Sequence, residues 1–190
     1  MTDKNIGEKT RISLWIKELR APFFIAVLFP TALGAVIAWN SFGVFDPALF
    51  ALSLVGVVCV NAGTNLANDY FDFRSGCDSV NMDFRSPFSC GSGLLPSGVL
   101  DARRVHTAAL AFFAVATLIG ISLALARGSL ILGLVLIGAL SGYFYTTHLA
   151  TRGIGEIIVG LNCGPFVVLG SYYVQTRTIA LEPLIASIAL

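Results

Sequence analysis

Amide and carboxylate side chains share one face of a predicted helix, at the end of an apolar run long enough to cross a bilayer. They are Asn61, Asn65, Asn68, Asp69 and Asp72, whose offsets of 0, 4, 7, 8 and 11 fall on one helical stripe. Because polar and ionisable groups at membrane depth are costly, this stripe predicts a functional site. Clustered oxygens suit a hard cation, and Mg²⁺ commonly joins one or two carboxylates to a substrate phosphate. The pattern predicts a membrane enzyme that handles a diphosphate.

Further charged residues and glycines follow this stripe. Asp78 and Asp83 come next, and a glycine-rich run occupies residues 91–98. Carboxylates alone repel a diphosphate, so a bridging cation is needed, and an arginine fork grips the remaining phosphate oxygens. Arg85 is the first candidate for that contact and Arg152 the second, although either could serve only to set the topology. Asp78 and Asp83 could equally cap helices.

The composition places most of the chain in lipid. Of its 190 residues 56% are hydrophobic and 12% are charged, against roughly 25% charged in a soluble domain. We therefore expect an all-α, polytopic membrane helical bundle with five full spans and the start of a sixth near Ile179. The predicted spans cover residues 23–39, 47–68, 105–126, 129–147 and 154–175.

Lysine and arginine are distributed unevenly between the predicted loops. Only Arg127 and Arg177, of the 12 basic residues, fall on one side. The positive-inside rule then places the N-terminus in the cytoplasm, together with the acidic loop between the second and third spans. The spans themselves are expected in the cell (inner) membrane. Residues 1–20 are predicted to form an interfacial segment, with Ile12, Trp15, Ile16 and Leu19 on one helical face. Residues 21–190 are predicted to form the membrane domain. The net charge of +1 gives no reason to expect a nucleic-acid partner.

The acidic string has a recognisable form. Asn68-Asp69-Tyr-Phe-Asp72, with Asp78 after it, resembles the first aspartate-rich motif of the UbiA-type intramembrane prenyltransferases. The string from Asn65 to Asp78 is most similar to the 1,4-dihydroxy-2-naphthoate polyprenyltransferase branch, which serves menaquinone synthesis. The runs at residues 91–98, 152–156 and 164–176 support that branch.

This resemblance implies a fold of about nine transmembrane helices around a central cavity, in which two aspartate-rich motifs hold Mg²⁺ against an isoprenoid diphosphate. It makes Asn68, Asp69, Asp72 and Asp78 the metal motif, with Asn65 beside them for substrate binding. The commonest family spacing puts a third acid four residues after Asp72, where this chain has Gly76; Asp78 takes the later place seen in the naphthoate branch.

The implied reaction moves a polyprenyl group from an allylic polyprenyl diphosphate to an aromatic acceptor. The expected acceptor is 1,4-dihydroxy-2-naphthoate, and another aromatic acceptor within the family is the alternative. Asp69 and Asp72 are then catalytic. Glu156 could orient or deprotonate the acceptor hydroxyl, or only favour a helix N-terminus. Tyr145 is expected to bind substrate, in a cavity whose aromatic lining shields a carbocation. Phe71, Tyr143, Phe144, Tyr145, Tyr172 and Tyr173 could form that lining.

The second aspartate-rich motif of the family follows its sixth helix, and no second acidic cluster exists before Leu190. We therefore expect a C-terminally truncated relative that is poorly active or inactive alone. A CDP-alcohol phosphatidyltransferase is disfavoured because its Asp-Gly and Ala-Arg motif is missing. A non-enzymatic transporter or ion-binding protein remains an alternative, although it predicts polar residues at mid-membrane in several spans.

Overall fold

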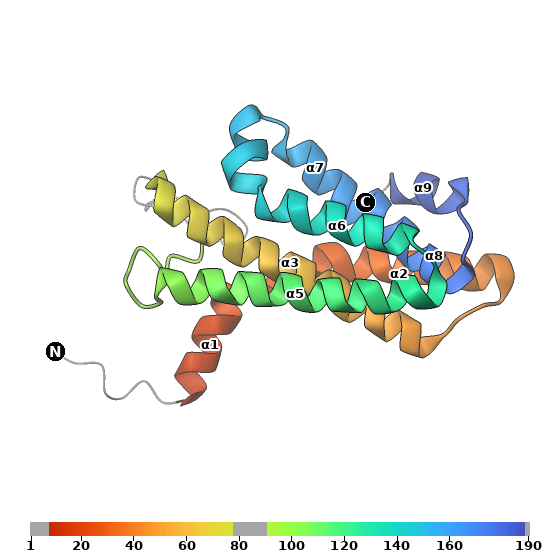
Figure 1. The fold of residues 1–190 in the computed structure, drawn as a ribbon, viewed down its shortest axis with the longest axis horizontal. Coiled ribbons are helices and arrows are strands. Elements are labelled where there is room, and N and C mark those ends of the chain that lie inside the picture. Colours follow the sequence, from red (N-terminus) through yellow and green to blue (C-terminus); the bar gives the residue numbers. More distant parts are fainter. Residues whose placement is uncertain (1–7, 78–90, 189–190) are drawn as a thin grey trace.

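The computed structural model describes residues 8–77 and 91–188, and within these ranges every regular element is a helix (Figure 1). The predicted all-α class is confirmed. The main helices are α1 (Glu8–Glu18), α2 (Ile25–Phe42), α3 (Pro47–Ser75), α5 (Ala102–Arg127), α6 (Leu130–Tyr143), α7 (Gly155–Leu161), α8 (Val167–Thr176) and α9 (Leu181–Ser187). Short 3₁₀ or π turns join several of them, at Ala21–Phe24, Tyr145–Leu149, Ala150–Arg152 and Asn162–Phe166.

The longest of these helices, α3, carries the polar stripe. The Asp46 side chain accepts hydrogen bonds from the backbone N–H groups of Ala48 and Leu49, at 2.9 and 3.1 Å, and so caps the first turn. The helix ends at Gly76, whose φ of 80° favours a residue without a Cβ. At about 1.5 Å per residue α3 is longer than the roughly 30 Å of a hydrocarbon core, so its C-terminal turns reach the membrane boundary.

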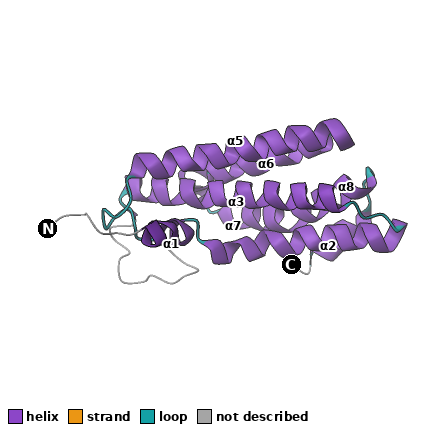
Figure 2. Cartoon of the chain, turned by 90° about the horizontal axis from the view of Figure 1, so that it is seen from below, coloured by secondary structure: helices purple, strands orange, loops and turns teal. Residues whose placement is uncertain are grey.

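The long helices run side by side, and α3 packs against α2, α5, α6 and α8 (Figure 2). A second close pair is α2 with α8, where Gly34 allows the backbones to approach, because a Cβ there would collide with the carbonyl of Val168. Gly142 on α6 similarly leaves room for the side chain of Thr64 on α3. Close helix contacts of this kind are typical of membrane bundles, in which small residues lie at the crossings.

Among residues 8–77 and 91–188, four helical segments are long and apolar enough to span a membrane, and a fifth is present if the bent pair around Phe144 counts as one span. They lie at Ala21–Phe42, Pro47–Ser75, Ala102–Arg127 and Gly155–Thr176, with the bent pair at Leu130–Tyr143 and Tyr145–Arg152. Four of the five predicted spans are thus found, and the remaining one, at residues 129–147, is found if the bent pair counts as one span. The fourth predicted span, at residues 129–147, is bent, because the chain turns by 67° after Tyr143. The second is longer than predicted and includes the whole polar stripe.

Helix α1 lies across the end of the bundle where α3 finishes and α5 begins (Figure 1). Its predicted apolar stripe divides in two. Trp15 and Leu19 pack against the core cluster formed around Leu66, whereas Ile12 and Ile16 are exposed. This arrangement suits a helix that rests on the bundle with one flank and on an interface with the other.

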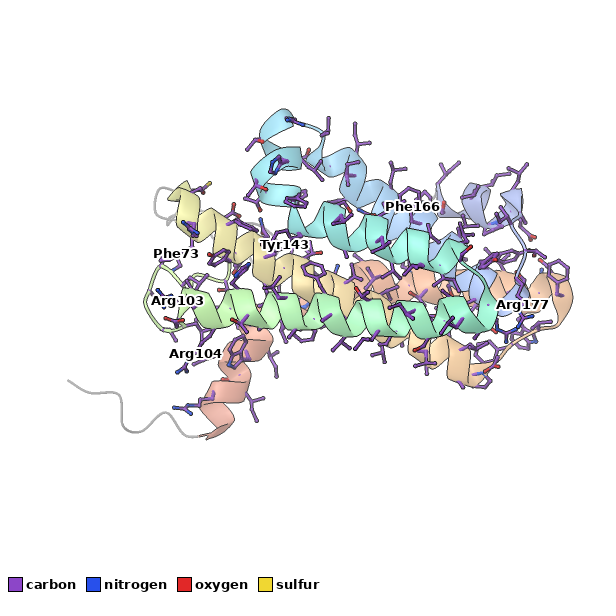
Figure 3. All side chains as sticks on the ribbon, viewed as in Figure 1. Phe73, Arg103, Arg104, Tyr143, Phe166 and Arg177 are labelled. Atoms are coloured by element: carbon purple, nitrogen blue, oxygen red, sulfur yellow. The ribbon has the colours of Figure 1, made fainter. Side chains whose placement is uncertain are left out.

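The two ends of the bundle differ in charge. Arg103 and Arg104 lie at the end where α3 finishes, and Arg177 lies at the opposite end (Figure 3). The Arg177 end is held together by Gln175, whose side chain exchanges two hydrogen bonds with the backbone of Asp46, at 2.7 and 3.2 Å. Arg127 lies 3.6 Å from the Asp46 carboxylate. Polar contacts therefore stabilise this end, and most of the basic residues that the structure describes lie at the other.

Candidate active site

A cavity of about 690 Å³ runs through the middle of the bundle, between α2, α3, α5, α6, α7 and α8. Its polar lining comes chiefly from Arg20, Asn61, Asn65, Asn68, Asp72, Tyr145, Glu156 and Asn162. Elsewhere the walls are mostly aliphatic, and include the buried cluster of Leu123, Ile131 and Val174. The cavity is therefore suited to a ligand with a charged group and a hydrocarbon part.

Asn68 is the hub of the polar region. Its side-chain nitrogen donates to Asp72 Oδ2 at 2.8 Å and to Thr146 Oγ1 at 2.7 Å, and its oxygen accepts from Arg20 Nη1 at 3.0 Å. Asn68 and Asp72 are one helical turn apart on α3, as the stripe requires. Thr146 reaches them because the chain bends after Tyr143. Three separate segments thus fix the orientation of one amide.

Arg20 was missed as a site residue, because the sequence suggested only a role in topology. It has a left-handed backbone conformation, with φ of 53°, between α1 and the short turn that precedes α2. Its guanidinium lies 4.4 Å from the centre of the Phe23 ring and lines the cavity. A non-glycine residue held in this conformation is uncommon, and such residues gather at functional sites. Its position two residues before Pro22, at the start of a span, is the signal that could have indicated it.

Asp69 is placed differently from Asp72, although both were predicted to hold the metal. Only 1% of Asp69 is exposed, and it is absent from the described lining of the cavity. Its Oδ2 accepts the backbone N–H of Ser92 at 2.7 Å, and its Oδ1 lies 3.7 Å from Arg20 Nη1. The hydroxyl of Ser92 in turn donates to Glu18. Of the two acids, Asp72 is the one that the structure brings to the cavity.

Asn65 joins the same region from the preceding turn of α3. Its side-chain nitrogen donates to the backbone carbonyl of Leu19 at 3.0 Å and to the side chain of Asn61 at 3.3 Å. Both asparagines line the cavity. Asn65 therefore links the interfacial helix to the polar stripe, in addition to its predicted place beside the substrate.

Tyr145 and Glu156 line the cavity from the segments that follow α6. Gly155 allows this arrangement, because a Cβ at that position would approach the Tyr145 ring to 2.9 Å. Glu156 is exposed, which places it where the cavity opens. Arg152 is also exposed but is absent from the described lining, so the structure gives no contact with the cavity for the second predicted phosphate ligand.

The expected aromatic lining is largely wrong. Of the six residues named, Tyr145 alone is found in the described lining, which contains Phe23 and Phe166 instead. Phe71 and Tyr143 contact each other edge to face at 5.3 Å, inside the packing between α3, α5 and α6. Tyr172 is buried between α2 and α8. These rings pack between helices and do not line the cavity. Large side chains fill the space beside helix crossings at which small residues lie.

The described residues fit a magnesium site only when a substrate contributes ligands. Asp72 and Glu156 bring two carboxylates to the cavity wall, and no group of three His, Cys, Asp or Glu side chains in the described ranges could hold a metal alone. Mg²⁺ bound through one or two carboxylates and the substrate phosphates needs no such group. Asn68 contributes no carboxylate, and its oxygen already accepts from Arg20. Asp78 and Arg85 lie outside the described residues.

Comparison with known proteins places the chain. Residues 27–190 match the UbiA prenyltransferase family. The chain belongs to this family. It is 29% identical over 187 residues to UbiA prenyltransferase domain-containing protein 1 of Homo sapiens, covering 96% of this chain and 53% of that protein. It is 31% identical over 182 residues to 1,4-dihydroxy-2-naphthoate octaprenyltransferase of Bacillus subtilis, covering 93% and 55%.

The fold is also that of the family. A solved structure described as digeranylgeranylglyceryl phosphate synthase superposes with a TM-score of 0.74 at 20% identity, over 94% of this chain and 57% of that one. This UbiA-family protein is an integral membrane protein, since its apolar helices and its fold agree. The chain spans about half the length of the curated relatives it matches.

Proposed function

We propose that this UbiA-family protein transfers a polyprenyl group from an allylic polyprenyl diphosphate to an aromatic acceptor. The observation that supports this most is the position of Arg20, Asn68 and Asp72 together at one region of a cavity whose other walls are mostly aliphatic. A diphosphate needs cationic and metal-binding groups, whereas its prenyl chain needs aliphatic walls. The cavity offers both to one molecule.

Arg20 and Asp72 serve the leaving group in this proposal. Arg20 donates to the diphosphate oxygens, and Asp72 is the described residue that would hold Mg²⁺ beside them. The cation, when bound, neutralises charge on the leaving group. The allylic carbon–oxygen bond breaks as the diphosphate departs, and the aliphatic walls limit the access of water to the carbocation. Phe23 and Phe166 line this space, in place of most of the aromatic residues first expected.

Glu156 and Tyr145 serve the acceptor. Glu156 orients the acceptor hydroxyl or takes its proton, which raises the electron density of the ring that attacks the allylic carbon. Tyr145 lies beside it as a polar aromatic contact. The new carbon–carbon bond then forms on the ring, and with dihydroxynaphthoate the carboxylate leaves as carbon dioxide.

The proposed acceptor is 1,4-dihydroxy-2-naphthoate, for menaquinone synthesis. The acidic string from Asn65 to Asp78 and the 31% identity with the octaprenyltransferase of Bacillus subtilis support this choice. Another aromatic acceptor is the alternative, since other relatives of similar identity carry a different name. We also propose that the protein lies in the cell membrane with the Arg103 end in the cytoplasm, as the distribution of basic residues indicates.

Transfer assayed in proteoliposomes tests this function. Geranylgeranyl diphosphate and dihydroxynaphthoate are supplied with Mg²⁺, and the prenylated product is measured by mass spectrometry. We expect slow product formation from the parent protein, as a poorly active chain would give, and the same rate from Asp101→Asn, which changes an exposed cap of α5. Product should be lost with Asp72→Asn. Sodium or proton flux without transfer, abolished by Asp72→Asn, would instead favour an ion-binding transporter.

A further inference from the structure

One serine joins two buried carboxylates that come from different parts of the chain. Ser92 donates its hydroxyl to Glu18 Oε2 on α1, and its backbone N–H to Asp69 Oδ2 on α3 at 2.7 Å. Glu18 is 0% exposed and Asp69 is 1% exposed. None of the three belongs to the described lining of the cavity. Burial of a carboxylate costs free energy unless the carboxylate is hydrogen-bonded, and Ser92 supplies a hydrogen bond to each of these two.

Of these two acids, Asp69 is also contacted by Arg20. Arg20 Nη1 lies 3.7 Å from Asp69 Oδ1 and donates to Asn68 Oδ1 at 3.0 Å. Because Arg20 occupies the oxygen of Asn68, the nitrogen of that amide is directed at Asp72 and Thr146. A displacement of Asp69 would move Arg20, and Arg20 would no longer fix the orientation of Asn68. The contacts thus lead from α1 to the cavity wall.

We propose that Glu18, Ser92 and Asp69 form a positioning clamp that fixes Arg20, Asn68 and Asp72 without touching substrate. This inference rests on the proposed function, because it concerns the same diphosphate site. It assigns to Asp69 the role of a positioning residue in place of a metal ligand. Partners in an outer shell orient the groups that bind a cation, and their loss typically costs about 10- to 100-fold in affinity.

The glycines around Ser92 explain why a clamp is needed. Gly91 and Gly93 flank it, and Gly93 has φ of 77°. A segment of this composition loses much conformational entropy when it is fixed. Glu18 fixes the serine by its side chain, and Asp69 fixes it by its backbone. The loop is thereby attached to both α1 and α3.

Cation binding in the presence of inorganic diphosphate tests the clamp apart from turnover. Mn²⁺ is titrated by electron paramagnetic resonance into the full-length protein in nanodiscs. We expect Glu18→Ala and Ser92→Ala each to weaken Mn²⁺ binding about 10-fold or more. The conservative variants Glu18→Gln and Ser92→Thr keep an acceptor and a hydroxyl, and should retain binding within about 3-fold. The double variant Glu18→Ala/Ser92→Ala should bind Mn²⁺ no more weakly than the weaker-binding of its two single variants, because both substitutions break the same hydrogen bond.

Ser97→Ala is the matched control. Ser97 lies in the same loop, but its hydroxyl donates only to the carbonyls of Gly93 and Leu94 among the described contacts. It should bind Mn²⁺ as the parent does. Ser92→Ala, which keeps the backbone N–H to Asp69, serves as the second variant where Glu18→Ala does not fold.

The outcomes separate this inference from the function on which it rests. Loss of Mn²⁺ binding in Asp72→Asn, with parental binding in Glu18→Ala and Ser92→Ala, overturns the clamp alone. Equal weakening by Ser97→Ala also overturns it, since any damage to the loop would then suffice. Unchanged binding in Asp72→Asn overturns the proposed cation site itself.

Discussion

The side-chain nitrogen of Asn68 donates to Asp72 Oδ2 at 2.8 Å, one helical turn along α3. The oxygen of the same amide is held by Arg20, so the pair is fixed in one orientation at the cavity wall. This relationship couples the acid that is proposed to hold Mg²⁺ to the arginine that is proposed to hold the diphosphate. It makes each of the three residues sensitive to a change in the others.

Asn68→Ala should therefore be more damaging than the loss of one neutral hydrogen bond. The variant removes contacts to Arg20, Asp72 and Thr146 together. We expect kcat/KM for the prenyl diphosphate to fall about 100-fold, as when one preorganised group is removed from a charged transition state. Steady-state kinetics with saturating acceptor measure this. A fall of less than about 3-fold would show that the orientation of Asp72 does not depend on the amide.

Arg20→Lys should fail to replace the guanidinium, although it keeps the charge. Lysine lacks the fork that can contact Asn68 and a phosphate together. We expect kcat/KM for the prenyl diphosphate to fall about 10- to 100-fold. Arg11→Lys, on the exposed part of α1, is the matched control and should behave as the parent. Equal rates in the two variants would remove Arg20 from the site.

Glu156→Gln should slow the attack of the acceptor on the allylic carbon and leave binding of the prenyl diphosphate intact. The glutamine keeps the size of the side chain but cannot accept the proton of a hydroxyl as a carboxylate does. We expect kcat to fall about 100-fold with an unchanged KM for the prenyl diphosphate. Glu182→Gln changes an exposed acid that contacts Ser41, outside the described cavity lining, and should be neutral. A raised KM for the prenyl diphosphate in Glu156→Gln would instead place Glu156 on the donor side.

Gly34→Ala should destabilise the bundle without any direct effect on chemistry. A Cβ there would collide with the backbone of α8, at Val168 and Tyr172. Overpacking of this kind costs about 1–3 kcal/mol. Gly133→Ala adds the same methyl group on α6, where nothing lies within 4 Å. Thermal unfolding in detergent should separate the two variants, and an equal melting temperature would argue against the close contact of α2 with α8.

The helices and the polar stripe could be predicted from sequence because both depend on local periodicity. The different positions of Asp69 and Asp72 relative to the cavity could not be predicted as readily. Adjacent residues on a helix are about 100° apart, so Asn68 and Asp69 cannot both face the cavity centre. The stripe was wide enough to include Asp69 at its edge, and only the packing of Ser92 and Arg20 against it shows which way it points.

The contributions of Arg20 and Glu18 depend on contacts between residues far apart in sequence, which periodicity does not reveal. Glu18 nevertheless gave a signal, since it shares a helical face with Trp15 and Leu19 and is therefore an acid on the apolar side of α1. We identify no sequence pattern that predicts the bend after Tyr143. It includes a π turn at Tyr145–Leu149, a feature that is frequent at functional sites.

The most direct test of the account is to locate a diphosphate in the protein. A structure determined by electron cryo-microscopy with geranylgeranyl thiodiphosphate and Mg²⁺ would show where the phosphorus atoms lie. The account predicts phosphate oxygens within hydrogen-bonding distance of Arg20, and the cation bound to Asp72, with the prenyl chain against the aliphatic wall. A diphosphate bound instead near Arg127 and Arg177, at the other end of the bundle, would contradict it.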